Sequence, residues 1–217
     1  MKRFKQFIVM LLSVAMLLSN SALTFAETKD ISSDKKALFE EQVKEVQSYM
    51  DSHPVGLTLN EQTQTFNVPL SNGENATVKI TLTKPGYSLA RDIYTAKLGT
   101  WNIDYNVTIP PSGSIKLRGT FKVTHVPNMS SSSLDCPKFN VTGSSISAVP
   151  PQGHSITDKG SSYRTVQTNH EYEISGYVTY NFSGQYTANY YVSMLLYCKT
   201  NSGSERDKIY VDTELSM

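Results

Sequence analysis

The sequence lacks the residue patterns that mark the commonest enzyme and metal-binding classes. Its 217 residues include four histidines and two cysteines, with no His-Glu-x-x-His pair, no paired-cysteine metal spacing and no Gly-x-Ser-x-Gly elbow. The one metal-like pattern is His170 followed by Glu171 and Glu173, and no third ligand motif accompanies it. The sequence therefore predicts no catalytic residues, no metal and no cofactor.

An excess of positive charge is also missing. The chain has 20 Lys and Arg against 19 Asp and Glu, and three of the basic residues lie in the first 26 positions, so residues 27–217 carry a formal charge of −2. A near-neutral chain without a basic block is poorly suited to nucleic acid or to an anionic membrane surface. We expect no nucleic-acid partner.

Long apolar runs are confined to the first 26 residues. Lys2, Arg3 and Lys5 precede an apolar run from Phe7 to Leu18, and small residues lead up to Ala26. A basic start, a short apolar core and a small-residue exit describe a secretory signal peptide, and the run is too short to span a bilayer comfortably. We expect cleavage after Ala26, no integral membrane segment afterwards, and a secreted, extracellular product with cell-wall association as an alternative destination.

Cysteine is scarce, and the two that are present are Cys136 and Cys198. In an oxidising compartment, a pair of cysteines in one exported chain is more often a bridge than two free thiols. We therefore predict a Cys136–Cys198 disulfide.

One amphipathic helix is predicted near the N-terminus, over residues 34–51. Apolar residues recur there at spacings of four, three and four, at Phe39, Val43, Val46 and Met50. The proline of His53-Pro54 ends the helix, because the residue before a proline avoids the helical region. The apolar stripe is narrow and is expected to lie across a sheet or along its edge.

The rest of the chain alternates apolar and polar residues, which predicts antiparallel hairpins with one buried face. The clearest hairpin runs from Trp101 to Val123, around the turn at 110–114. The register we expect there pairs Val107 with Leu117 and Tyr105 with Gly119, so that the tyrosine ring covers the glycine gap. A hairpin at 66–82 is expected to pair Val68 with Val78, and a third, at 172–196, to pair Phe182 with Tyr186.

These patterns predict a mainly β chain, an antiparallel β-sandwich of Ig-like character with one N-terminal amphipathic helix. The domains we expect are a signal peptide (1–26), a polar leader with the helix (27–56), and a single β-sandwich domain (57–217). Ser, Pro and Gly dominate residues 126–162, where we predict a long loop region with only short strands.

The positions of two tyrosines in the alternating pattern of the third hairpin predict a candidate ligand-binding surface. In the third hairpin the apolar residues share one face, and the other face brings Tyr177 across from Tyr191, beside Thr179 and Asn189. A tyrosine offers a flat apolar face with a polar tip, which suits sugars and protein side chains. Burial of this pair beneath another sheet is the competing interpretation.

The chain resembles the small uncharacterised secreted proteins of Gram-positive bacteria that carry a domain of unknown function. The resemblance rests on the leader, on the block from Gly99-Thr100-Trp101 to Thr124-His125, and on Ser175-Gly176-Tyr177-Val178-Thr179-Tyr180. It implies export and carries no site or activity with it.

The function that these observations favour is a secreted or cell-surface-associated binding protein, non-enzymatic, with a glycan, the cell wall or another extracellular protein as its partner. Two alternatives stay open. One is a secreted hydrolase assembled from His154, His170 and acidic residues. The other is a β-pore-forming or antagonistic toxin, because Ser/Thr-rich segments such as 139–149 can supply membrane hairpins.

Overall fold

The computed structural model describes residues 34, 36–60, 62–85, 96–110, 113–127, 135–182, 186–199 and 207–217. The chain divides into two units, Met1–Phe39 and Glu40–Met217, and the fold below is that of the second. The expected signal peptide and its cleavage site lie outside the described residues.

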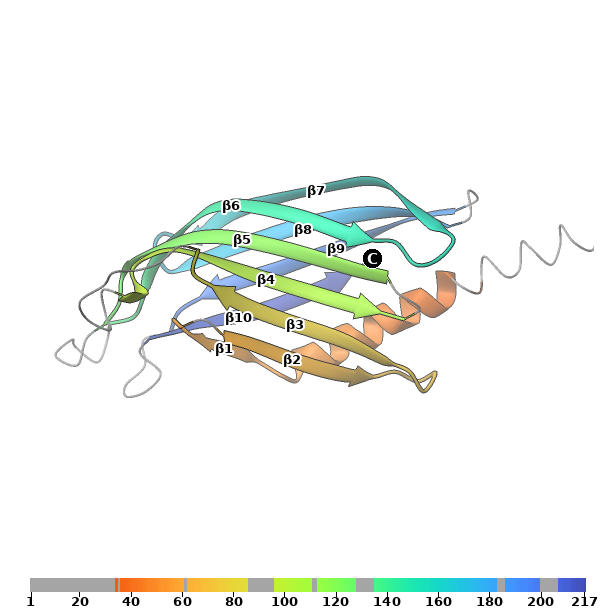
Figure 1. The fold of residues 1–217 in the computed structure, drawn as a ribbon, viewed down its shortest axis with the longest axis horizontal. Coiled ribbons are helices and arrows are strands. Elements are labelled where there is room, and N and C mark those ends of the chain that lie inside the picture. The colour runs from red at the N-terminus through yellow and green to blue at the C-terminus, as the bar shows by residue number, and fades with distance from the viewer. Residues whose placement is uncertain are drawn as a thin grey trace, which may run out of the picture. The chain divides into compact units, whose positions relative to one another are not determined.

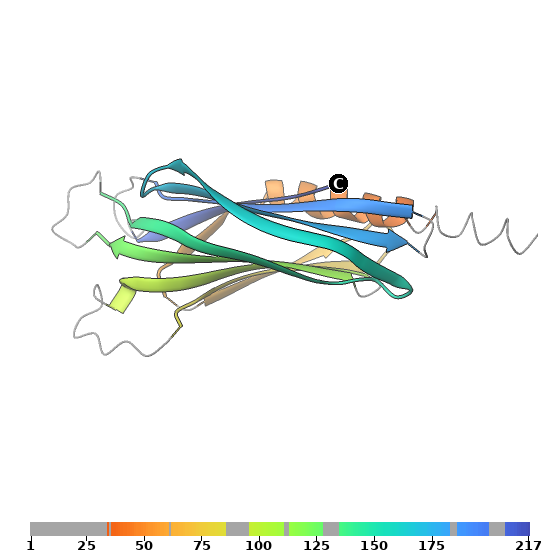
Figure 2. The same ribbon diagram turned by 90° about the horizontal axis from the view of Figure 1, so that it is seen from above.

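Among the described residues, ten strands form two antiparallel sheets, which lie as two layers in Figures 1 and 2. Sheet A has the order β1-β10-β9-β8-β7 and sheet B the order β2-β3-β4-β5-β6. The strands are β1 (Val55–Thr58), β2 (Gln62–Pro69), β3 (Asn75–Thr83), β4 (Gly99–Ile109), β5 (Gly113–His125), β6 (Lys138–Val149), β7 (His154–Gln167), β8 (Glu171–Phe182), β9 (Tyr186–Tyr197) and β10 (Lys208–Ser216). The predicted β-sandwich is confirmed. Each sheet is built mainly from strands that follow one another along the chain, so the strand order differs from the Greek-key order of immunoglobulin domains.

The core lies between the inner faces of the two sheets, where a glycine on each sheet faces an isoleucine of the other. A Cβ atom on Gly119 of β5 would lie 2.2 Å from Ile174 Cδ1 of β8, and a Cβ on Gly176 of β8 would lie 2.8 Å from Ile146 Cδ1 of β6. Both glycines therefore admit a side chain from the opposite sheet, and a larger residue at either would force the sheets apart.

The registers of two predicted hairpins are wrong by two residues. In the structure Tyr105 pairs with Leu117 and Val107 with Ile115, while Phe66, not Val68, pairs with Val78. The gap beside Gly119 is consequently filled by Ile174, and not by Tyr105 as expected. Alternation fixes which face a residue occupies, but a shift of two residues leaves the face unchanged, so only the turn length decides the register.

The long loop region expected at 126–162 is also corrected. It contains all of β6 and more than half of β7, two of the longest strands, and residues 128–134 lie outside the described part. β6 and β7 are the edge strands of the two sheets and run side by side, joined by a hydrogen bond of 3.2 Å between the Ser144 and Ser161 hydroxyls (Figures 1 and 2). Most β7 side chains face solvent. The strand therefore lacks the alternation of apolar and polar residues from which strands were predicted elsewhere in the sequence.

A helix over residues 36–51 agrees with the prediction, and its part from residue 40 onward lies along a sheet edge as expected. Val43, Val46 and Met50 are buried. The Gln47 side chain donates to the Thr213 carbonyl at 3.2 Å and accepts from the Leu215 amide at 2.6 Å. β1 pairs only with residues 208–211 of β10, so Gln47 satisfies backbone groups in the part of β10 that β1 leaves unpaired. In the described part of the chain, no helix has the length and apolar character needed to cross a membrane.

Candidate functional site

The predicted tyrosine pair lies on the outer face of sheet A. Tyr177 of β8 and Tyr191 of β9 are register partners, as the third hairpin predicted, and Thr179 pairs with Asn189 in the next row. The inner-face residues of both strands are buried, whereas Tyr191 is 50% exposed. The competing interpretation, a tyrosine pair buried between two sheets, is therefore wrong.

Tyr177 is held in place by its neighbours on β7. Its hydroxyl donates to Asp158 Oδ2 at 3.0 Å, and its ring lies over Gly160, where an added Cβ would come within 2.7 Å of Cε1. The hydrogen bond and negative charge of Asp158 raise the pKa of the Tyr177 phenol above its ordinary value. The ring is fixed and stays neutral, while Tyr191 beside it is open to solvent.

Thr179 and Asn189 extend this surface with polar groups. The Thr179 hydroxyl donates to Asn189 Oδ1 at 2.8 Å, which orients the amide. Asn189 is exposed, and its amide nitrogen remains as a donor for a ligand. The structure thus brings all four predicted ligand-binding residues together in two neighbouring rows of one sheet face.

A second tyrosine pair on the same face was missed by the sequence analysis. Tyr197 of β9 and Tyr210 of β10 are register partners whose rings stack with centroids 5.6 Å apart. Tyr197 is six residues from Tyr191 along β9, or about 20 Å. The signal was available, because Tyr197 has the same outward parity as Tyr191.

Tyr197 is anchored much as Tyr177 is. Its hydroxyl donates to Asp212 Oδ1 at 3.2 Å. Burial and the neighbouring Asp212 charge raise the pKa of Tyr197 to about 12. The Lys199 ammonium lies 5.4 Å from the centroid of the Tyr197 ring and 4.6 Å from that of Tyr210.

Cys136, Cys198 and His170 form a separate cluster at one end of the sandwich. Cys136 precedes β6, Cys198 follows β9, and His170 ends the turn between β7 and β8, in which Asn169 has φ 65°. Asparagine tolerates this left-handed conformation better than most residues. The two Sγ atoms lie 2.9 Å apart, and each is 3.4 Å from His170 Nδ1.

Both cysteines of this cluster are free thiols in the structure. The 2.9 Å separation of the sulfur atoms exceeds the bond length of about 2.05 Å in a disulfide. Cys198 donates to the Pro137 carbonyl at 3.1 Å, and burial, with the adjoining Cys136, raises the pKa of its thiol. The structure brings the two predicted partners together without a bond, and the disulfide stays a prediction.

The same three side chains offer soft donor atoms that lie within 4.8 Å of one another. Structural zinc sites in proteins are closed by four ligands, and the described residues supply three here. The opposed sulfur atoms match a dithiol better than a completed metal centre.

The remaining histidines are dispersed. His154 begins β7 and packs against the Phe182 ring at 4.7 Å, whereas His170 lies beyond the far end of the same 14-residue strand, about 45 Å away. His125 contacts Asp135 through Nε2 at 2.8 Å, as a sheet-end residue with a partner would. His154 and His170 are therefore too far apart to serve one hydrolytic centre.

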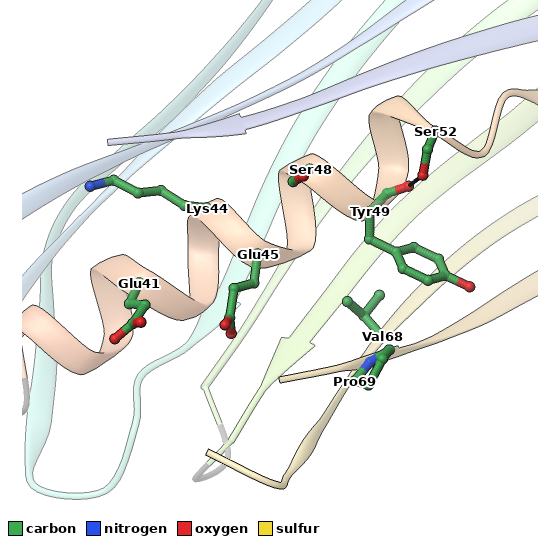
Figure 3. Close-up of a pocket in the computed structure, with 8 residues that line it drawn as sticks. All are labelled: Glu41, Lys44, Glu45, Ser48, Tyr49, Ser52, Val68 and Pro69. Carbon is green, nitrogen blue, oxygen red and sulfur yellow. Dashed lines mark hydrogen bonds between the residues drawn. The ribbon is translucent and has the colours of Figure 1, made fainter. Parts of the chain in front are cut away.

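A pocket of about 510 Å³ separates the helix from β2 (Figure 3). It is lined by Glu41, Lys44, Glu45, Ser48, Tyr49 and Ser52 from the helical segment and by Val68 and Pro69 from β2. The Glu45 carboxylate accepts from the Ser71 amide at 3.1 Å and 3.3 Å, so it holds the β2–β3 turn against the helix. The residues around the pocket therefore have a structural role, which is to attach the helix to the β2–β3 turn.

Comparison with protein-family models, with curated proteins and with solved structures finds no match.

Proposed function

We propose that this protein is a secreted or cell-surface-associated binding protein, non-enzymatic, and that it engages its ligand with the outer face of sheet A around Tyr177 and Tyr191. The observation that carries the proposal is the half-exposed Tyr191 beside an anchored Tyr177. A large aromatic side chain exposed on a sheet face, with fixed polar neighbours, is the material of recognition surfaces.

Export is the second part of the proposal. It rests on the basic and apolar leader of residues 1–26 and on the resemblance to small secreted proteins of Gram-positive bacteria. A glycan, the cell wall or another extracellular protein is the class of partner that such a location supplies. The intact mass of protein recovered from a culture supernatant tests export, and a product beginning at Glu27 is expected.

We also propose that Cys136 and Cys198 close to a disulfide when the chain reaches an oxidising compartment. The reaction is a thiol–disulfide exchange in which an external disulfide is reduced to two thiols as the Sγ–Sγ bond forms. The opposed sulfur atoms support it, since each needs to move by less than 1 Å. Peptide mapping without reductant should recover the linked peptides.

A glycan and cell-wall binding array on the purified protein tests the proposed surface. Tyr191→Ala should weaken binding at an unchanged thermal midpoint. The matched control is Tyr163→Ala, which removes a tyrosine of similar exposure, 45%, from the edge strand β7. Equal loss with both variants, or no loss with Tyr191→Ala, would contradict the assignment of the surface.

A further inference from the structure

The two tyrosine pairs on the outer face of sheet A share a cross-strand register and an aspartate partner, and they differ in that a ring stack joins Tyr197 and Tyr210. We call them the 177–191 pair and the 197–210 pair. In each, the two tyrosines are register partners on adjacent antiparallel strands, β8 with β9 and β9 with β10. Both pairs lie at outward positions of strands whose other face is buried in the core.

An aspartate accepts from one tyrosine of each pair, although Asp158 comes from a third strand, β7, and Asp212 from β10, the strand that also carries Tyr210. The Tyr177 hydroxyl donates to Asp158 at 3.0 Å, and the Tyr197 hydroxyl donates to Asp212 at 3.2 Å. Each pair therefore combines two aromatic faces, which carry negative quadrupole density, with one carboxylate.

The 197–210 pair already has an occupant. The Lys199 ammonium lies over both of its rings, at 4.6 Å and 5.4 Å from the centroids, within the range of a cation–π interaction. Among the described residues, no lysine or arginine lies over the rings of the 177–191 pair. One of two similar sites is thus filled by a lysine of the chain itself, and the other is open to solvent at Tyr191.

We propose that the 177–191 pair, with Asp158, binds the ammonium group of a lysine side chain presented by a partner polypeptide. This proposal rests on the proposed binding function and names the chemistry that the same surface recognises. The lysine stem would lie along the exposed Tyr191 ring, with the ammonium directed to the carboxylate. The outer face of sheet A favours a cation, since its described residues include five acidic and three basic ones: Asp158, Glu171, Glu173, Asp212 and Glu214 against Arg164, Lys208 and Lys199, which follows β9.

The direct test is a titration with Nα-acetyl-lysine methylamide, followed by NMR of the tyrosine ring protons. The expected result is a shift of the Tyr177 and Tyr191 signals. The probe acetylated at Nε, which is neutral and close in shape, should bind about five- to thirty-fold more weakly. Equal affinity for the two probes would overturn the proposal.

Variants separate recognition from folding. Tyr191→Leu keeps an apolar side chain but removes the π face, so it should lower the affinity for the lysine probe by on the order of five-fold at an unchanged thermal midpoint. Unaltered affinity in Tyr191→Leu would also overturn the proposal. Tyr163→Leu is the matched control and should bind like the wild type.

The internal comparison has its own test. Lys199→Met removes the charged occupant of the 197–210 pair, and the same probe should then shift the Tyr197 and Tyr210 signals as well. If the vacated pair fails to take up the lysine probe, the argument from likeness between the pairs is wrong.

The outcomes also distinguish this proposal from the proposed function. Binding of an array ligand that depends on Tyr191, without any response to the lysine probe, would refute lysine recognition and leave the binding function standing. A response to the lysine probe with no array ligand bound supports a polypeptide partner over a glycan.

Discussion

The two outer faces both belong to five-stranded antiparallel sheets and carry very different side chains. On sheet A the outward positions include four tyrosines in two cross-strand pairs, with aspartates bonded to two of the hydroxyls. On the described strands of sheet B, no outward position holds an aromatic residue, and Thr, Asn and Lys predominate. The difference separates the face that we propose binds a ligand from one whose side chains pair its own strands.

The middle strands of sheet B, β4 and β5, pair polar side chains with one another. Asp104 is only 8% exposed; it accepts from Arg118 Nε at 2.6 Å and Nη2 at 2.8 Å, and Lys116 Nζ lies 2.9 Å away. Thr120 donates to Asn102 in the neighbouring row at 2.9 Å. Such cross-strand pairs hold the register of two interior strands, and they occupy polar groups that could otherwise contact a ligand.

The largest expected effect on the free energy of unfolding concerns the predicted disulfide between Cys136 and Cys198. If the predicted disulfide forms, it ties Cys136, next to sheet B, to Cys198, at the end of a strand in sheet A, across a separation of 62 residues. Cys136→Ser should then lower the free energy of unfolding by about 2–4 kcal/mol. Denaturant unfolding measures this, and Cys198→Ser and the double variant should show the same loss. A sum of two independent losses in the double variant would argue against the bond.

The next largest effect tests whether the outer face of sheet B contributes to stability and not to ligand binding. Asp104→Ala removes the carboxylate that accepts from Arg118 and neutralises Lys116, and should destabilise the fold by about 2 kcal/mol. Ligand binding at sheet A should be unchanged. Asn106→Ala, the next outward position on β4, is the control and should alter stability by less than about 0.5 kcal/mol. Loss of binding with Asp104→Ala at retained folding would break the comparison between the faces.

The same carboxylate predicts a pH dependence. Burial opposes ionisation of Asp104, but the hydrogen bonds and charges of Arg118 and Lys116 outweigh it and hold the pKa of the group below its ordinary value. The stabilisation is therefore present above the unfolded-state pKa and is lost as the pH falls through the lower folded-state value. Unfolding of the wild type and Asp104→Asn should differ at pH 7, with the difference shrinking towards pH 3. A constant difference over this range would show that the charge is not responsible.

The smallest expected effect on stability is the most informative for sheet A. Tyr191→Ala removes a half-exposed ring and should change the free energy of unfolding by less than about 0.5 kcal/mol, while it weakens ligand binding. The thermal midpoint and the binding array are measured on the same sample. A fall in the midpoint comparable to that of Asp104→Ala would show that Tyr191 contributes to folding as sheet B's pairs do.

The candidate site was predictable because side-chain direction on a strand depends on parity alone. Tyr177 and Tyr191 fall opposite the apolar set of their hairpin, and the three-residue connection at 183–185 fits the predicted pairing of Phe182 with Tyr186. The hairpin at 101–123 failed by two residues for the same reason, since parity does not measure the length of a turn. The pairing of Tyr197 with Tyr210 could not be predicted from alternation, because it depends on which strand lies beside β9.

Local periodicity in the sequence was enough to predict the sandwich class, the helix, the buried faces and the outward position of Tyr177 and Tyr191. Tertiary structure alone decided which strands are neighbours, that β6 and β7 close one side of the sandwich, that Ile174 fills the space beside Gly119, and that Lys199 covers one tyrosine pair and not the other. These features depend on contacts between segments far apart in the chain. The periodicity of apolar and polar residues within one segment does not specify which other segment it packs against.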